Sequence, residues 1–258
     1  IIKDNLAKIR KEFEIDFVIA NGENASHGFG LTVLACNELL KSGIDLITGG
    51  NHSFDKKKDM IVLLQTANVL RPDNYPEGLV GSGVKICEVQ TNEGIEKLAV
   101  INLMGQFAMP MVENPFNWAK KLVEELKEKD VKNIFIDFHA EATSEKRIML
   151  MMFKNQVSAI CGTHTHVGTD DLQIFENTAY LTDIGLTGCK DNVIGMDSKI
   201  PIQKVITGIG GHFEVPNSCK SILQMMVVDI EDGKAQSAFK IKKHCNNSKL
   251  FITEAFVD

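Results

Sequence analysis

The stretch Ser158-Ala159-Ile160-Cys161-Gly162-Thr163-His164-Thr165-His166 decides the fold that we expect for this chain. A short run of small and branched residues is typical of a buried strand, and the glycine lets the chain turn sharply where that strand ends. Two histidines follow at i and i+2, so in an extended loop both imidazoles can face one side. Neutral imidazoles at this spacing suit a metal ion, although an isolated His-x-His pair is about as often a hydrogen-bonded loop.

The same pattern, an apolar run that ends in polar side chains, recurs three times. A predicted strand at 15–20 is followed by Asn21-Gly22-Glu23-Asn24, and a second predicted strand is followed by Gly49-Gly50-Asn51-His52. A third apolar run ends at His139. Taken singly, such side chains are more often turn formers, solvated carboxylates or satisfied buried imidazoles. Four coincidences at strand ends favour a shared site.

Strands alternate with amphipathic helices over most of the chain. Helices are predicted at 1–13, 32–41, 57–65, 115–129 and 144–153, and strands at 15–20, 45–48, 85–90, 98–103, 133–138, 158–162, 178–182, 221–230 and 238–241. This alternation predicts an α/β layered fold whose ligands bind beyond the carboxyl ends of the strands. Nothing resembles a linker or an internal repeat, so we expect a single domain over residues 1–258.

Composition limits the classes of partner and compartment. The net charge of −6 over 258 residues argues against a broad surface that follows the phosphates of duplex nucleic acid. The apolar runs are too short to span a membrane, so we expect a soluble protein without a membrane partner. Six cysteines occur without any Cys-x-x-Cys pair, which predicts reduced thiols and a cytoplasmic location. The sequence leaves homo-oligomerisation open.

The candidate site residues offer carboxylate, carboxamide and imidazole groups but no thiolate. They are Glu23, Asn24, Asn51, His52, His139, His164 and His166. This inventory suits hard-to-borderline divalent metals and is large enough for two ions. A two-metal site can clamp a phosphate and generate hydroxide at neutral pH. The residues therefore favour a metal site that could activate water beside a bound phosphate.

Four longer motifs resemble those of a known family. They are NGEN at 21–24, GNH at 50–52, DFHAEATSEK at 137–146 and GTHTHV at 162–167. Together they resemble the calcineurin-like metallophosphoesterases, and specifically the YmdB-like family of bacterial 2′,3′-cyclic nucleotide phosphodiesterases. The resemblance covers nearly the whole chain, including Arg71-Pro72, Thr182-Asp183 and Gly195-Met196-Asp197. It implies a metallophosphoesterase-type four-layer sandwich, in which two packed mixed β-sheets are flanked by helices.

The resemblance also implies a role for each site residue. Glu23 resembles the carboxylate that bridges two metal ions. The other ligands would divide between the ions, with Asn24 and His166 on the first and Asn51, His139 and His164 on the second. His52 resembles the general acid that protonates the leaving ribose oxygen, while a metal-bridging hydroxide attacks phosphorus.

The resemblance further implies which ions and substrates to expect. Because imidazoles are among the ligands, iron or manganese is expected, with magnesium and zinc as alternatives. The expected substrate is a small phosphodiester, above all a 2′,3′-cyclic nucleotide. Two other functions stay open: a phosphomonoesterase or nucleotidase at the same site, and a non-catalytic regulatory protein that binds metal or nucleotide.

The chain departs from the family pattern at its beginning. Family members begin with a short strand that ends in Gly-Asp, and the aspartate is a ligand of the first metal ion. No such strand precedes the predicted helix at 1–13, so we expect that roughly 15 to 20 residues, a strand and its turn, are absent from this sequence. Gln106, where relatives often carry arginine, and the loop at Cys189-Lys190 also differ, and both bear on substrate preference.

Overall fold

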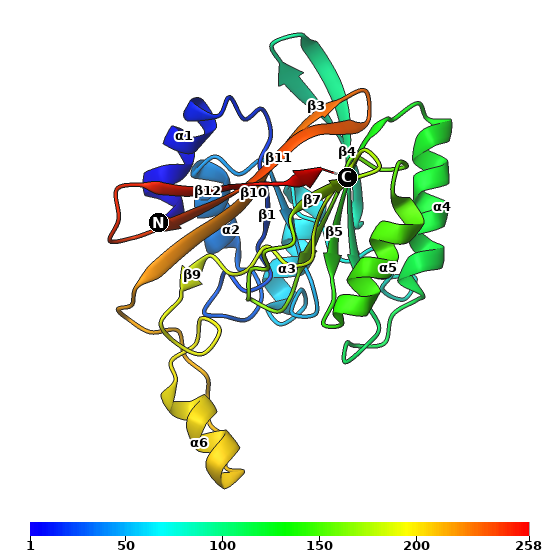
Figure 1. Cartoon of the computed structure of the whole chain (residues 1–258). Helices are drawn as coiled ribbons and strands as arrows, with labels where there is room; N and C mark the ends of the chain where they lie inside the picture. The colour runs from blue at the N-terminus through cyan, green and yellow to red at the C-terminus, as the bar shows by residue number, and fades with distance from the viewer. Residues whose placement is uncertain (258) are drawn as a thin grey trace.

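The computed structural model describes residues 1–257, in which helices and strands alternate over most of the chain (Figure 1). The helices are α1 (Ile2–Glu12), α2 (Val33–Lys41), α3 (Lys57–Thr66), α4 (Pro115–Glu128), α5 (Thr143–Phe153) and α6 (Lys199–Thr207). The strands are β1 (Ile19–Asn21), β2 (Leu46–Thr48), β3 (Val84–Thr91), β4 (Gly94–Met104), β5 (Asn133–His139), β6 (Ala159–Thr163), β7 (Gln173–Phe175), β8 (Thr178–Leu181), β9 (Gly188–Cys189), β10 (Ser221–Glu231), β11 (Lys234–His244), β12 (Leu250–Glu254) and β13 (Phe256–Val257).

A seven-stranded mixed sheet with the order β13-β7-β8-β6-β5-β4-β3 forms the central layer. Its middle strands β4, β5, β6 and β8 run parallel, because the crossovers through α4 and α5 return the chain to the same end of the sheet. The register sets Met104 opposite His139, and His139 opposite Thr163. The carboxyl ends of three neighbouring strands therefore meet at one place.

Helices α4 and α5 cover one face of this sheet (Figure 1). The Asn114 side chain accepts hydrogen bonds from the amides of Phe116 and Asn117, and Pro115 occupies the first turn, so α4 begins where the sequence predicts. The apolar faces of both helices pack on β4, β5 and β6 in the largest buried cluster. The methionine row of α5 supplies Met149 to this core.

Two smaller sheets face the other side of the seven-stranded sheet. β1 and β2 form a parallel pair, and β9 to β12 form an antiparallel sheet with the order β12-β11-β10-β9. Ala235 and Ala238 of β11 pack on β6 and β8, while Leu46 of β2 packs with residues of β3 and β4. Helix α1 covers the four-stranded sheet, and α2 and α3 cover the parallel pair. The predicted four-layer sandwich is confirmed, with its second sheet divided in two.

A cavity of about 1450 Å³ lies between β1 and β10. Among residues 1–257, β1 pairs only with β2, and β10 beyond Ile222 pairs only with β11, so the facing edges of these strands have no strand partner. The cavity is lined by apolar side chains between the sheets, such as Phe17 and Met225, and by Glu23 and His139 at the strand ends. It thus connects the space between the sheets with the candidate site.

The structure adds four strands that the sequence did not predict, β7, β9, β12 and β13, and two further segments differ from the expectation. β1 is shorter than the predicted strand at 15–20, because the amide of Val18 donates to the Asp45 carboxylate and the Arg10 guanidinium binds the carbonyls just before it. Helix α6 was not predicted. It lies on an arm that projects from the body (Figure 1), and none of its side chains is buried. No described helix, α6 included, is both long and apolar enough to cross a membrane.

Cys189 and Cys219 form a disulfide at the base of this arm. The prediction that all six cysteines are reduced is therefore wrong for these two residues. Antiparallel pairing sets Cys189 of β9 opposite Ser221 of β10, which brings the two cysteine Cα atoms to 5.5 Å, within reach of a bridge. The other cysteines are free, with Cys36, Cys87 and Cys161 buried and Cys245 exposed.

Candidate metal centre

The candidate site lies at the carboxyl ends of β1, β2, β5 and β6. The structure brings together all seven residues that the sequence singled out, because each lies within hydrogen-bonding distance of another member, through its side chain or main chain. Glu23 and Asn24 follow β1, Asn51 and His52 follow β2, His139 ends β5, and His164 and His166 follow β6. Four separate turns thus converge on one point.

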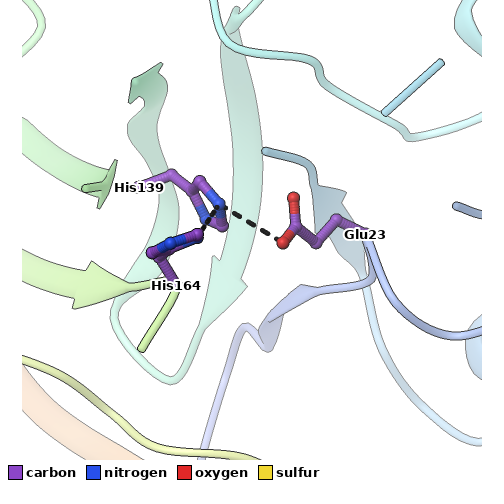
Figure 2. Close-up of side chains that lie close together, drawn as sticks. All are labelled: Glu23, His139 and His164. Carbon is purple, nitrogen blue, oxygen red and sulfur yellow. Dashed lines mark hydrogen bonds and ion pairs between the residues drawn. The ribbon is translucent and has the colours of Figure 1, made fainter. Parts of the chain in front are cut away.

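Three potential ligand atoms surround His139 Nε2, which is itself a fourth. It lies 2.8 Å from Asn51 Oδ1, 3.1 Å from His164 Nδ1 and 3.2 Å from Glu23 Oε1. Figure 2 shows the Glu23 carboxylate and the two imidazoles pointing toward one another. A single ring nitrogen has one lone pair or one proton, so it cannot satisfy three partners, whereas a shared cation can.

Asn24 and His166 form a second group next to the Glu23 carboxylate. Asn24 Nδ2 is 3.2 Å from Glu23 Oε1 and 3.1 Å from His166 Nε2. The side-chain oxygen of Asn24 is buried and has no hydrogen-bond partner among the described residues. A buried polar atom without a partner is rare in proteins and costly, so this oxygen fits the position of a metal ligand. Glu23 Oε1 contacts both groups, as a bridging carboxylate would.

Burial controls the charges in this cluster. It raises the pKa of the Glu23 carboxyl to about 8, and Asp137 and Asp55 add to that rise while hydrogen bonds from His52 and Asn24 oppose it. Burial also lowers the pKa of His139 to well below its ordinary value, and lowers that of His164. His139 and His164 are therefore neutral near pH 7 and offer lone pairs, and a cation would stabilise the ionised Glu23 carboxylate.

A chain of hydrogen bonds orients His139. Asp137 accepts hydrogen bonds from Thr48 Oγ1, Thr163 Oγ1 and Asn21 Nδ2. The Thr163 hydroxyl has one proton and donates it to Asp137. Its oxygen therefore accepts a hydrogen bond from His139 Nδ1, which lies 3.0 Å away. The Nε2 lone pair of His139 is thereby directed into the cluster.

The loop that carries His164 and His166 has a strained backbone, and residues outside the loop hold it in place by hydrogen bonds. Both histidines have positive φ angles, 103° and 64°, which side chains other than glycine rarely adopt. His166 Nδ1 lies 2.8 Å from the carbonyl oxygen of Ile194 and must donate to it, so its Nε2 faces Asn24 with a lone pair. The buried Asp183 accepts from the Thr165 amide and pairs with buried Lys146 at 2.8 Å.

His52 lies beside the cluster rather than within it. Its main-chain amide donates to Glu23 Oε2, and its Nδ1 lies 2.8 Å from Asp55 Oδ2. The Phe29 ring packs edge-on against the imidazole. Asp55 therefore fixes the Nδ1 side of the ring, and its Nε2 is left to exchange a proton.

Reasoning from the sequence missed three residues that hold the site. Asp55 follows His52 at i+3, a short spacing that could have been noticed. Glu141 follows His139 at i+2, and its carboxylate lies 3.1 Å from His164 Nε2. Asp137 was read only as part of an apolar strand, although a carboxylate inside such a strand needs several hydrogen-bond donors.

The donor set of this site fits divalent transition metals. Imidazole nitrogens, carboxylate oxygen and carboxamide oxygens converge without any thiolate. A four-layer α/β sandwich with such a cluster at the carboxyl ends of its strands is the architecture of the metallophosphoesterases. The family model described as YmdB-like protein matches residues 1–243. The chain therefore belongs to the YmdB-like protein family.

Relatives of known sequence and structure agree with this assignment. The chain is 41% identical over 244 residues to a protein of Bacillus subtilis (strain 168) named 2′,3′-cyclic-nucleotide 2′-phosphodiesterase, with 94% of this chain and 90% of that protein covered. A crystal structure of a hypothetical protein from Thermus thermophilus superposes with a TM-score of 0.85 and 32% identity, over 98% of this chain and 93% of that one. The crystal structure of a novel phosphatase from Mycoplasma pneumoniae superposes with a TM-score of 0.80 and 32% identity, over 98% of this chain and 86% of that one.

Proposed function

We propose that this protein is a phosphoric ester hydrolase that cleaves small phosphodiesters, foremost 2′,3′-cyclic nucleotides, with two divalent metal ions. The observation that carries the proposal is the meeting of Asn51 Oδ1, Glu23 Oε1 and His164 Nδ1 around His139 Nε2. The 41% identity to the Bacillus subtilis phosphodiesterase supports the choice of substrate.

The proposed ligands divide as the geometry groups them. Glu23, Asn51, His139 and His164 would hold one ion, and Glu23, Asn24 and His166 the other. When bound, the ions supply positive charge that polarises the phosphate and lowers the pKa of a water molecule. Iron or manganese is proposed ahead of magnesium or zinc, because nitrogen ligands are prominent.

The chain's own residues would then handle the leaving group. His52, held through Nδ1 by Asp55, would donate a proton from Nε2 to the departing ribose oxygen. A 2′,3′-cyclic phosphate expels an alkoxide, which is a poor leaving group unless it is protonated. The protein would thus bind the phosphate at the ion pair and deliver the proton from the His52 side.

Two further expectations stay proposals. A cytoplasmic location in a bacterial cell is supported by four free cysteines, although the Cys189–Cys219 bridge is unusual for that compartment. We also propose one metallophosphoesterase domain over 1–258.

A substrate panel tests the proposed function. Protein reconstituted with manganese should hydrolyse 2′,3′-cyclic nucleotides faster than nucleoside monophosphates, and chelation should abolish the activity. Faster release of phosphate from monophosphates would instead identify a nucleotidase. Metal binding without turnover on any phosphate ester would identify a regulatory binding protein and contradict the proposal.

A further inference from the structure

The three candidate histidine ligands share one arrangement. Each directs one ring nitrogen into the site, and each has its other ring nitrogen bound to a group outside it. For His164, Nδ1 faces His139 Nε2 at 3.1 Å, and Nε2 lies 3.1 Å from Glu141 Oε2. Glu141 is the one charged group among these outer partners.

The chemistry of the carboxylate determines which nitrogen of His164 carries the proton. An ionised carboxylate only accepts hydrogen bonds, so the short contact requires a proton on Nε2. In a neutral imidazole this leaves the lone pair on Nδ1, the nitrogen that faces the cluster. A carboxylate behind a metal-binding imidazole also makes that imidazole a more basic ligand.

The backbone does not orient this ring by itself. His164 has a φ of 103°, which lies outside the favoured backbone regions, and the usual rotamer preferences therefore do not fix its side chain. Its side chain is 23% exposed, so packing does not enclose it as it encloses His139, which is 1% exposed. The Glu141 contact is therefore the main restraint on the Nε2 side of the ring.

We propose that Glu141 is a positioning residue for His164, holding the proton on Nε2 and presenting the Nδ1 lone pair to the ion shared with His139. The inference rests on the proposed two-metal function. Exposed pairs of this kind contribute little to folding stability, and Glu141 is 48% exposed. Its removal should therefore alter metal binding without unfolding the protein.

Calorimetric titration of the metal-free protein with Mn²⁺ tests this role. In Glu141→Ala, the affinity for one of the two ions should fall about 10- to 100-fold, the usual effect of removing such an outer partner. Glu141→Gln should lose less, because its amide oxygen still accepts from Nε2. Glu128→Gln, which removes an equal charge from the exposed end of α4, should bind both ions like the wild type.

Imidazole NMR gives a readout that a purely structural role would not move. In the Zn²⁺-loaded wild type, His164 should carry its proton on Nε2 and exchange it slowly with water because Glu141 accepts it, and Glu141→Ala should speed up this exchange. A wild-type proton on Nδ1, unchanged affinities in Glu141→Ala, or equal weakening of both ions would overturn the inference. If Glu141→Ala does not fold, Glu141→Met, which keeps the length of the side chain but has no oxygen to accept from Nε2, decides by the same criteria. Wild-type protein that binds both ions but hydrolyses no phosphodiester would refute the proposed function alone.

Discussion

Replacing Gly50 by alanine should weaken metal binding without changing any proposed ligand. A Cβ atom at this position would lie 2.0 Å from Glu23 Oε2 and 2.5 Å from His139 Cε1 and Nε2. Ordinary carbon contacts begin near about 3.5 Å, so the carboxylate or the imidazole must move by more than about 1 Å. Displacements of about 1 Å at a reactive site cost roughly 10²-fold in rate.

We expect Gly50→Ala to bind fewer than two ions and to lose roughly 10²-fold or more in turnover. Overpacking in a closely packed site also costs about 1–3 kcal/mol of unfolding free energy, which thermal denaturation of the metal-free protein measures. Gly210→Ala serves as the control, because its Cβ would meet nothing nearer than 3.6 Å, on the arm that carries α6. Two ions and wild-type turnover in Gly50→Ala would refute the geometry described for Glu23 and His139.

Three further predictions follow from the contacts around the site. His52→Ala should keep its metal content and lose about 10²-fold in turnover on cyclic nucleotides, but much less on a nitrophenyl ester that needs no proton; equal losses on both would rule out a general acid. Lys146→Met should leave the buried Asp183 carboxylate without its counter-charge and cost about 3–5 kcal/mol in thermal unfolding, whereas Lys154→Met, at a half-exposed pair, should cost far less. In chelator, the contribution of Glu23 to the unfolding free energy should fall as pH rises from about 4.5 to about 8, because burial raises the pKa of Glu23 to about 8 and favours its neutral form in the folded state. Chemical denaturation of the wild type and of Glu23→Gln should show this fall as the difference between their two pH profiles, and parallel profiles would contradict the assignment.

Local patterns in the sequence were sufficient for the parallel core of the fold. The apolar runs that became β5 and β6 and the capped helix at Asn114 depend on residues close in sequence. Clusters such as Gly49-Gly50-Asn51-His52 could be recognised because parallel strands end at the same edge of a sheet. The sequence therefore predicted that the seven candidate side chains gather at one edge of the sheet, but not that Asp55, Glu141 and Asp137 hold them.

Features that depend on distant partners could not be predicted in this way. The Cys189–Cys219 bridge depends on β9 pairing with β10, between segments about 30 residues apart. Helix α6 was missed because it buries nothing, so its apolar residues show no contrast between an inner and an outer face. The division of the second sheet also depends on strand pairing rather than on local pattern.

Anomalous diffraction from crystals of the manganese-loaded protein tests the central claim most directly. The account predicts two anomalous peaks on either side of the Glu23 carboxylate. One should lie within bonding distance of Asn51, His139 and His164, and the other should lie beside Asn24 and His166. Peaks remote from Glu23, or the absence of any peak at these strand ends in active protein, would contradict a two-metal centre.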